Sequence, residues 1–364
     1  MNDERTSSRR RPRRWMVFVG IAAGLIAAGV VGGLVASAFD SDSTTSNSAS
    51  GATCAATKVA SRTLPAVVTI EAQGAGGSGT GSGEVIRSSG EILTNNHVIS
   101  SAANSGSVDV VFDDGTTEPA TIVGRDPQTD LAVLKVQPTK TLHVIPVGAS
   151  SKLAVGQPVV ALGAPLGLSG TVTTGIVSAL ERSVQVPADG NQTALLVGAI
   201  QTDAAINPGN SGGSLVDCAG KLVGVPTAGA VVPSPSGASA GNIGIGFAIP
   251  SELAKTIANE LITHGSITHS SFGVQVSTVP GNSARQQPAG LYVVNVARGG
   301  PADAAGLRVG DVLTRADDRP LSSAEQLQEV TLTRRPGETV QVNFRRGGDE
   351  HTANVTLGAQ SSSS

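Results

Sequence analysis

Short apolar runs separated by turn residues constrain the fold of this 364-residue chain more than any other feature. Valine, isoleucine and leucine dominate the runs, and the 46 glycines of the chain supply many of the interruptions. This spacing is typical of an all-β barrel or sandwich and not of alternating helices and strands. The predicted strands include residues 66–70, 84–86, 108–112, 131–136, 158–162 and 221–225.

One serine, Ser211, lies in a glycine-rich heptapeptide at residues 209–215. Gly209 and Gly212 allow a sharp turn there, because glycine adopts backbone conformations that other residues avoid. In such a turn the backbone amides of Gly209 and Ser211 can converge on the oxyanion of an acyl-transfer reaction. The alternative is a Gly/Ser-rich surface loop, and a second motif has to decide between the two.

A histidine and an aspartate precede this serine next to apolar, strand-like runs. His97 follows an Asn-Asn pair in the stretch 92–98, and Asp130 stands directly before the run 131–136. A serine nucleophile needs a base to take its proton and a carboxylate to orient that base. The order His, Asp, Ser is that of the chymotrypsin barrels, whereas subtilisin and the α/β-hydrolases use other orders. The sequence therefore predicts a catalytic triad of His97, Asp130 and Ser211.

With these motifs the chain resembles the HtrA family of trypsin-like serine proteases, over about residues 64–358. The resemblance implies a mainly β fold, with a chymotrypsin-like double β-barrel followed by a PDZ domain. It makes His97 the general base, Asp130 its orienting carboxylate and Ser211 the nucleophile. Ser214 stands where the family usually has proline, a small change outside the chemistry. The stretches that carry the resemblance are residues 94–98, 129–133, 201–207, 209–215 and 241–250.

The substrate pocket is predicted to lack a charge. Ala205 stands six residues before Ser211, where proteases that cut after lysine or arginine have an aspartate. The resemblance places Asp203 in a strand and not at the pocket floor. With Ala205 and Ile206 at the pocket, we expect cleavage after small or medium aliphatic residues. Selectivity should be loose, because an apolar pocket discriminates by only about 1 to 3 kcal/mol per methylene.

The amino terminus has the features of a membrane anchor. Arginines are concentrated in residues 1–14, and the stretch from Val17 to Ala38 carries no charge. As a helix this stretch would be about 33 Å long, which spans the hydrocarbon layer. We predict a cytoplasmic tail (1–14) and a transmembrane helix (15–39), with the rest of the chain extracytoplasmic. The alternative is a signal peptide cleaved near Ala38, although such segments have shorter apolar regions.

Residues 40–57 contain almost no bulky apolar side chain and are predicted to form a disordered linker. This linker contains Cys54, and the only other cysteine of the chain is Cys218. In an oxidising compartment an even number of cysteines favours a disulfide, with two independent thiols as the alternative. In the chain-entropy model, a bridge that closes so long a loop stabilises by about 4 to 5 kcal/mol before strain is subtracted.

The remaining organisation follows from the resemblance. Residues 58–250 form the expected protease domain and residues 268–358 the expected PDZ domain. Between them, residues 251–267 are predicted to be a linker helix capped by Ser251, because their apolar residues have helical spacing. A disordered tail is expected at residues 359–364.

Peptide binding is expected in the PDZ domain at Ser271, Phe272, Gly273 and Val274, which match the carboxylate-binding loop of this domain class. Backbone amides around Gly273 would bind a peptide carboxy terminus while the peptide adds as a strand to the sheet edge. The alternative is that Phe272 and Val274 only fill the core. Alternate residues of a strand are compatible with either function.

Other classes of function find no support in the sequence. A net charge of −3 gives no reason to expect nucleic acid, and the Gly-rich stretch 76–83 lacks the lysine of a nucleotide loop. We therefore expect no cofactor, no metal and no requirement for ATP. The Gly/Ser/Pro segment 227–241 is predicted to be a mobile loop near the pocket. The histidines outside the triad have no metal-site spacing; they are His143, His264, His269 and His351.

These observations predict a membrane-anchored, ATP-independent serine endopeptidase that degrades unfolded or damaged extracytoplasmic proteins and recognises peptide C-termini. The substrate class comes from the resemblance, which also implies a homo-trimer. One alternative is a chaperone or peptide-binding scaffold with weak or conditional proteolysis. Another is a signalling protease that cuts a single membrane partner. The sequence leaves open whether the PDZ domain activates or inhibits.

Overall fold

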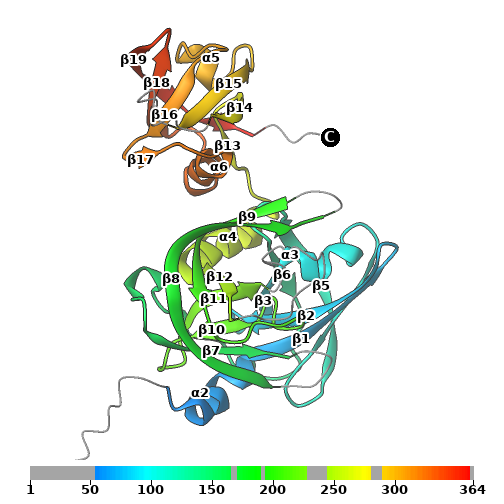
Figure 1. The fold of residues 1–364 in the computed structure, drawn as a ribbon. Helices are drawn as coiled ribbons and strands as arrows, with labels where there is room; N and C mark the ends of the chain where they lie inside the picture. Colours follow the sequence, from blue (N-terminus) through cyan, green and yellow to red (C-terminus); the bar gives the residue numbers. More distant parts are fainter. Residues whose placement is uncertain (1–53, 165–169, 190–192, 228–243, 280–288, 361–364) are drawn as a thin grey trace, which may run out of the picture. The chain divides into compact units, whose positions relative to one another are not determined.

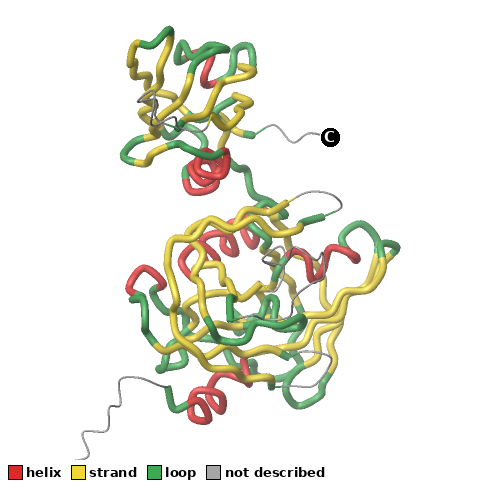
Figure 2. Tube along the Cα trace, viewed as in Figure 1, coloured by secondary structure: helices red, strands yellow, loops and turns green. Residues whose placement is uncertain are grey.

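The computed structural model describes residues 54–164, 170–189, 193–227, 244–279 and 289–360, which are largely β-structure (Figure 1). Strands and loops dominate, and the helices are short (Figure 2). The predicted mainly β fold is confirmed. The predicted cytoplasmic tail, membrane helix and most of the linker lie outside the described residues, as do residues 228–241 of the predicted loop. Within the described ranges, no helix is both long and apolar enough to cross a membrane.

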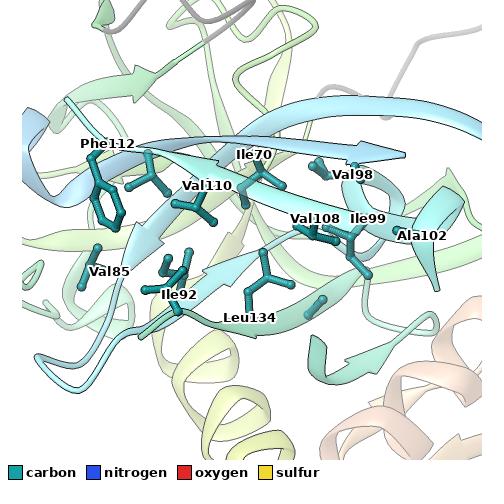
Figure 3. Close-up of a cluster of buried hydrophobic side chains, with 14 of the residues drawn as sticks. Ile70, Val85, Ile92, Val98, Ile99, Ala102, Val108, Val110, Phe112 and Leu134 are labelled. Carbon is teal, nitrogen blue, oxygen red and sulfur yellow. The ribbon is translucent and has the colours of Figure 1, made fainter. Parts of the chain in front are cut away.

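The first barrel is closed by six antiparallel strands in the order β1-β2-β3-β6-β5-β4. Successive side chains of a strand point to opposite faces, so every second residue enters the barrel. Ile70, Val85, Ile92 and Leu134 are fully buried in this core (Figure 3). The strands are β1 (Val67–Gly74), β2 (Gly77–Val85), β3 (Glu91–Thr94), β4 (Gly106–Val111), β5 (Thr117–Asp126) and β6 (Leu131–Lys135).

The second barrel repeats this architecture with the strand order β10-β11-β12-β9-β8-β7. Its core contains Val159, Ile200, Leu215 and Val223. The strands are β7 (Pro158–Gly163), β8 (Thr171–Pro187), β9 (Thr193–Thr202), β10 (Ser214–Val216), β11 (Leu222–Thr227) and β12 (Gly246–Pro250), and the one-turn helix η3 (Ser150–Lys152) precedes them.

A shared apolar cluster joins the two barrels. The side chains of Leu93 and Val133 point outward from the first barrel. They pack in one cluster with Leu196 and Ile249 of the second barrel. Because the outward residues of two strands contribute to this cluster, the barrels have a continuous buried interface. Residues at the barrel mouths are thereby positioned with respect to one another.

Helix α4 (Ser251–His264) covers this interface, and its buried Ile257 and Leu261 belong to the same cluster. The predicted helix is therefore present, but the prediction that Ser251 caps it is wrong. Pro250 occupies the N-cap position, and Ser251 Oγ donates instead to the Gly148 carbonyl oxygen at 3.2 Å. The Ser251 hydroxyl therefore binds a carbonyl oxygen that is distant in sequence and not a backbone amide of the helix.

The described amino-terminal end is joined to the second barrel. Helix α2 (Ala56–Thr63) includes the last two residues of the expected linker, and the one-turn helix η1 (Leu64–Ala66) follows it. Val59 of α2 packs in one cluster with Leu162 and Val216 of the second barrel. A disulfide connects Cys54 to Cys218, whose Cα atoms are 5.0 Å apart, across a sequence separation of 164 residues.

The carboxy-terminal domain has its own core, which includes Phe272, Leu291, Leu313 and Phe344. Its larger sheet has the order β14-β15-β16-β18-β19, with β17 paired to β16, and β13 pairs with β20. The elements are β13 (Ser270–Ser271), β14 (Val274–Val279), β15 (Gly290–Val296), α5 (Pro301–Ala304), β16 (Val312–Ala316), β17 (Arg319–Pro320), α6 (Ala324–Thr333), β18 (Thr339–Arg346), β19 (Asp349–Thr356) and β20 (Gly358–Ala359).

Candidate active site

Asp130 lies in a tight turn between β5 and β6, which we call the aspartate turn (residues 126–131). Asp130 is fully buried and has a φ of 58°, in the left-handed region that few residues other than glycine adopt. The Asp130 carbonyl oxygen accepts from Asn95 Nδ2 at 2.8 Å and from the Asn96 amide at 3.1 Å. These bonds offset the conformational cost of the turn and join it to the segment that leads into α3 (Asn96–Ile99), which is followed by η2 (Ser100–Ala102).

The Asp130 carboxylate lies against the imidazole of His97, which is part of α3. His97 Nδ1 is 2.8 Å from Asp130 Oδ2 and 3.0 Å from Oδ1, and the His97 amide donates to Oδ1 at 3.0 Å. Thr227 Oγ1 donates to Oδ2 at 3.2 Å. The carboxylate is fully buried, whereas the His97 side chain is 30% exposed. The geometry thus fixes one ring nitrogen on the carboxylate.

Ser211 lies in the nucleophile turn (residues 209–214), which precedes β10. Gly209 has a φ of 99° and Gly212 a φ of 78°, so glycine is required at both positions. The backbone of Gly212 also lies very close to the first barrel. A Cβ atom there would be 2.3 Å from the Ser82 carbonyl oxygen and 2.4 Å from Thr94 Oγ1. The predicted sharp turn is present.

Two contacts bring the nucleophile turn to the histidine and the aspartate. A Cβ on Gly212 would lie 2.9 Å from the amide nitrogen of Asn95, two residues before His97. The Gly212 amide donates to the Pro226 carbonyl oxygen at 3.0 Å, and the neighbouring Thr227 binds the Asp130 carboxylate. Residues from both barrels therefore meet at one site.

The predicted pocket residues shortly precede the nucleophile turn, and Ala205 is hydrogen-bonded to it. The Ala205 carbonyl oxygen accepts from Asn210 Nδ2 at 3.2 Å and from Thr173 Oγ1 at 3.0 Å. Ile206 is buried, and a Cβ at Gly246 would lie 2.5 Å from Ile206 Cγ1. Asp203 is exposed, and its carboxylate accepts from the Ile176 amide at 2.7 Å. Asp203 lies one residue after the end of β9 and not in a strand as predicted, and its carboxylate accepts from a backbone amide.

In the carboxy-terminal domain, the predicted peptide-binding residues serve different functions. Phe272 is buried in the core and Val274 packs against it. Gly273 has a φ of 70°, and its amide donates to Ser271 Oγ at 3.0 Å. A cavity lies between β14 and α6, with Val274, Leu327 and Thr331 in its lining.

Sequence reasoning missed several residues that support the site. Thr227 binds the Asp130 carboxylate, and Asp126 accepts from Thr129 Oγ1 within the aspartate turn. His269, for which the sequence suggests no function, is also part of this group. Its Nε2 lies 2.9 Å from Oδ1 of the buried Asp126. Of these contacts, only the one between Thr129 and Asp126 could have been expected from the sequence, because the two residues are three positions apart. The other partners are distant in sequence.

No grouping of histidine, cysteine and carboxylate side chains suited to a metal ion occurs in the described segments. The chemistry of this site instead requires a hydroxyl, an imidazole and a carboxylate. These groups, together with the two barrels, define the class as a trypsin-like serine protease joined to a second domain.

Two family models match the chain. A trypsin-like peptidase domain matches residues 81–225, and a PDZ domain matches residues 270–357. The first match lies within the two barrels, whose strands run from residue 67 to residue 250, and the second covers most of the carboxy-terminal domain. The carboxy-terminal domain is therefore a PDZ domain.

The chain is similar to several named proteases. Serine protease PepD of Mycobacterium tuberculosis is 43% identical, over 96% of this chain and 79% of the relative. Serine protease Do-like HtrA of Lactococcus lactis subsp. cremoris is 38% identical, over 78% of this chain and 72% of the relative. A probable periplasmic serine endoprotease, DegP-like, of Bartonella henselae is 42% identical, over 76% of this chain and 52% of the relative.

Solved structures give the same result. The HtrA-type protease AlgW with a tripeptide has a TM-score of 0.67 and 36% identity, over 84% of this chain and 97% of that protein. The chain belongs to the HtrA family of serine proteases, and it is a serine-type endopeptidase with a trypsin-like domain and a PDZ domain.

Proposed function

We propose that Ser211 is the nucleophile of this endopeptidase, with His97 as general base and Asp130 as the carboxylate that orients it. The observation that carries this proposal is the bond between His97 Nδ1 and the buried Asp130 carboxylate. A carboxylate only accepts hydrogen bonds, so Nδ1 carries the proton and Nε2 is left as an acceptor. This is the tautomer that a general base requires.

The reaction then proceeds in two halves. His97 Nε2 takes the proton of Ser211 Oγ as Oγ attacks the substrate carbonyl carbon, and His97 returns that proton to the leaving amine. In the second half a water molecule gives a proton to His97 and attacks the acyl carbon, the ester bond to Ser211 Oγ breaks, and His97 returns the proton to Oγ. Asp130 stabilises the imidazolium that forms in each half and does not itself become protonated.

The amides of Gly209 and Ser211 are the proposed donors to the oxyanion. The positive φ of Gly209 (99°), which tightens the turn directly before the nucleophile, supports this choice. The Asn210 amide donates to Asn207, the Gly212 amide to Pro226 and the Gly213 amide to Asn210, each through the backbone carbonyl. Fixed donors at this position stabilise negative charge without reorganisation, and each is worth about 10²–10³ in rate.

The proposed substrates are chains cleaved after small or medium aliphatic residues. The side chains at the pocket support this specificity, because Ala205 and Ile206 carry no charge and the Asp203 carboxylate is bound to a backbone amide. Peptide substrates that end in valine or alanine should be cut better than those that end in arginine. A preference for arginine would contradict the proposed pocket.

We further propose that the enzyme degrades unfolded or damaged proteins outside the cytoplasm, while the amino-terminal segment anchors it to the membrane and the PDZ domain binds peptide C-termini. The periplasmic name of the Bartonella henselae relative supports this location. The basic, then uncharged, amino-terminal sequence supports the anchor. A trimer of the soluble part is the assembly we expect, and light scattering measures it.

The decisive experiment compares the wild-type protein with Ser211→Ala in casein degradation and in suppression of aggregation. We expect Ser211→Ala to abolish degradation, because residual rates without the nucleophile are lower by about 10⁶. Undiminished degradation would refute the assignment of Ser211. Complete retention of aggregation suppression by Ser211→Ala would favour an added chaperone role, and digestion of mixed extracts at one protein only would favour a selective signalling protease.

A further inference from the structure

The outer face of β2 carries two polar side chains beneath the nucleophile turn. Ser82 and Glu84 are two residues apart and therefore point to the same side of the strand. Val85, the last residue of β2, points to the other side, into the barrel core. Ser82 and Glu84 are both fully buried. These two polar groups thus lie in the interface between the barrels, where a buried polar group needs a partner.

Ser82 binds the beginning of the nucleophile turn. Its Oγ donates to the Gly209 carbonyl oxygen at 2.6 Å and accepts from the Ala164 amide at 2.8 Å. Its amide donates to the Ser211 carbonyl oxygen at 2.8 Å. One residue of the first barrel therefore fixes the backbone on both sides of Asn210.

Glu84 binds the end of the same turn. Ser214 Oγ donates to Glu84 Oε2 at 2.7 Å, and Ser214 is fully buried as well. Val67 and Leu93 flank Glu84 on the neighbouring strands, and both are buried. In the described part of the chain, Glu84 Oε1 has no hydrogen-bond partner. A carboxyl group is therefore enclosed by apolar side chains and one hydroxyl.

We propose that Glu84 and Ser214 form a buried hydrogen bond between the barrels that positions the nucleophile turn for catalysis. Ser214 is three residues after Ser211 and stands where the family usually has proline. The hydroxyl that replaces proline thus has a partner in this chain. The inference rests on the proposed role of Ser211 as nucleophile, and it makes Glu84 a positioning residue.

Burial favours the uncharged form of Glu84, whereas the hydrogen bond from Ser214 would also be accepted by a carboxylate. Burial raises the pKa of Glu84 well above its ordinary value, although the Ser214 hydrogen bond opposes this shift. The groups that face Glu84 from β1, β3 and β10 are Val67, Leu93 and Ser214, and none is charged. Ionisation would place a negative charge in this apolar interface, which is strongly unfavourable.

A pH dependence follows. A raised pKa means that the folded chain retains the Glu84 proton at a pH where the unfolded chain has lost it. Between the ordinary and the raised pKa, the free energy of unfolding therefore decreases as the pH rises. We expect the geometry of the nucleophile turn, and with it kcat, to deteriorate over the upper part of this range.

The test measures kcat, KM and thermal unfolding from about pH 5 to about pH 10 for the wild type, Glu84→Gln and Ser214→Ala. Glu84→Gln keeps the acceptor but cannot ionise, so it should retain kcat at the wild-type optimum and lose the decrease in kcat and in Tm on the alkaline side. Ser214→Ala should lower kcat by about tenfold with KM little changed, because the carboxyl loses the donor that Ser214 supplies.

Glu91→Gln is the matched control, since this carboxylate of the same barrel already binds Lys135 Nζ at 2.9 Å. It should leave the alkaline side of the rate profile as in the wild type. Superimposable rate profiles of the wild type and Glu84→Gln, or unchanged kcat in Ser214→Ala, would overturn the proposal. Ser211→Ala in the same assay separates this proposal from the proposed role of Ser211. If Ser211→Ala remained active, the assignment of the nucleophile would be wrong, whatever the result for Glu84.

Discussion

The aspartate turn and the nucleophile turn position their functional residues by different means. The aspartate turn is bound through side chains that ionise, with Asp126 accepting from Thr129 Oγ1 and lying 2.9 Å from His269 Nε2. The nucleophile turn is bound mainly through its own backbone, which donates to Pro226 and accepts from Ser82. At the end of this turn, Ser214 donates to the buried carboxyl of Glu84.

The two turns should therefore differ in the kinds of substitution that disrupt them. A turn held by side chains loses its geometry when those side chains are truncated or change charge. A turn held by close backbone approach loses its geometry when any atom is added to it, because a packed interior cannot yield by an ångström. The following variants test the comparison on both turns.

Asp130→Asn should have the largest effect. An amide at this position would present a donor to His97 Nδ1 and favour the wrong tautomer. The same change lowers kcat by about 10⁴ in a chymotrypsin-type triad. Steady-state kinetics on a peptide substrate measure the loss, and circular dichroism checks the fold. Asp203→Asn is the control, because that exposed carboxylate accepts from the Ile176 amide and lies outside the aspartate turn. A loss below tenfold for Asp130→Asn would contradict the assigned geometry.

Gly212→Ala should have the next largest effect. The added Cβ would lie 2.3 Å from the Ser82 carbonyl oxygen, so the nucleophile turn must move away from the first barrel. A displacement of about 1 Å at a catalytic group can cost about 10²-fold in rate. Gly115→Ala is the matched control, because Gly115 has nearly the same φ, 80°, and no atom within 4 Å of a Cβ. Equal kinetic effects of the two variants would show that backbone strain, and not close approach, is responsible.

His269→Ala should have a smaller effect on the aspartate turn. The buried Asp126 carboxylate would lose one partner, and we expect kcat to decrease by about tenfold while KM changes little. His264→Ala is the control, because its pair with Glu260 is exposed and such pairs contribute little. If both variants retained wild-type kcat, the side chains around Asp126 would not position the triad.

The sequence allowed the fold and the triad to be predicted because their signals are local. Apolar runs with frequent turns predicted the barrels, and glycines on both sides of Ser211 predicted its sharp turn. The supporting contacts could not be predicted in this way. Ser214 is 130 residues from Glu84, and His269 is 143 residues from Asp126. Such pairs depend on how the two barrels and the linker pack together.

The error at Ser251 has the same origin. A serine before an apolar helical pattern predicts an N-cap. In the folded chain Ser251 is the first residue of α4, and its hydroxyl binds the Gly148 carbonyl oxygen. Local pattern therefore located the helix correctly but not the partner of its first side chain.

The central claim is that residues from two barrels form one serine protease site around Ser211. The most direct test is reaction of the full-length protein with a fluorophosphonate, followed by mass spectrometry of the peptides. The account predicts a single adduct on Ser211, formed much more slowly in Asp130→Asn and absent in Ser211→Ala. An adduct on another serine, or equal labelling of Ser211 in Asp130→Asn and the wild type, would contradict it.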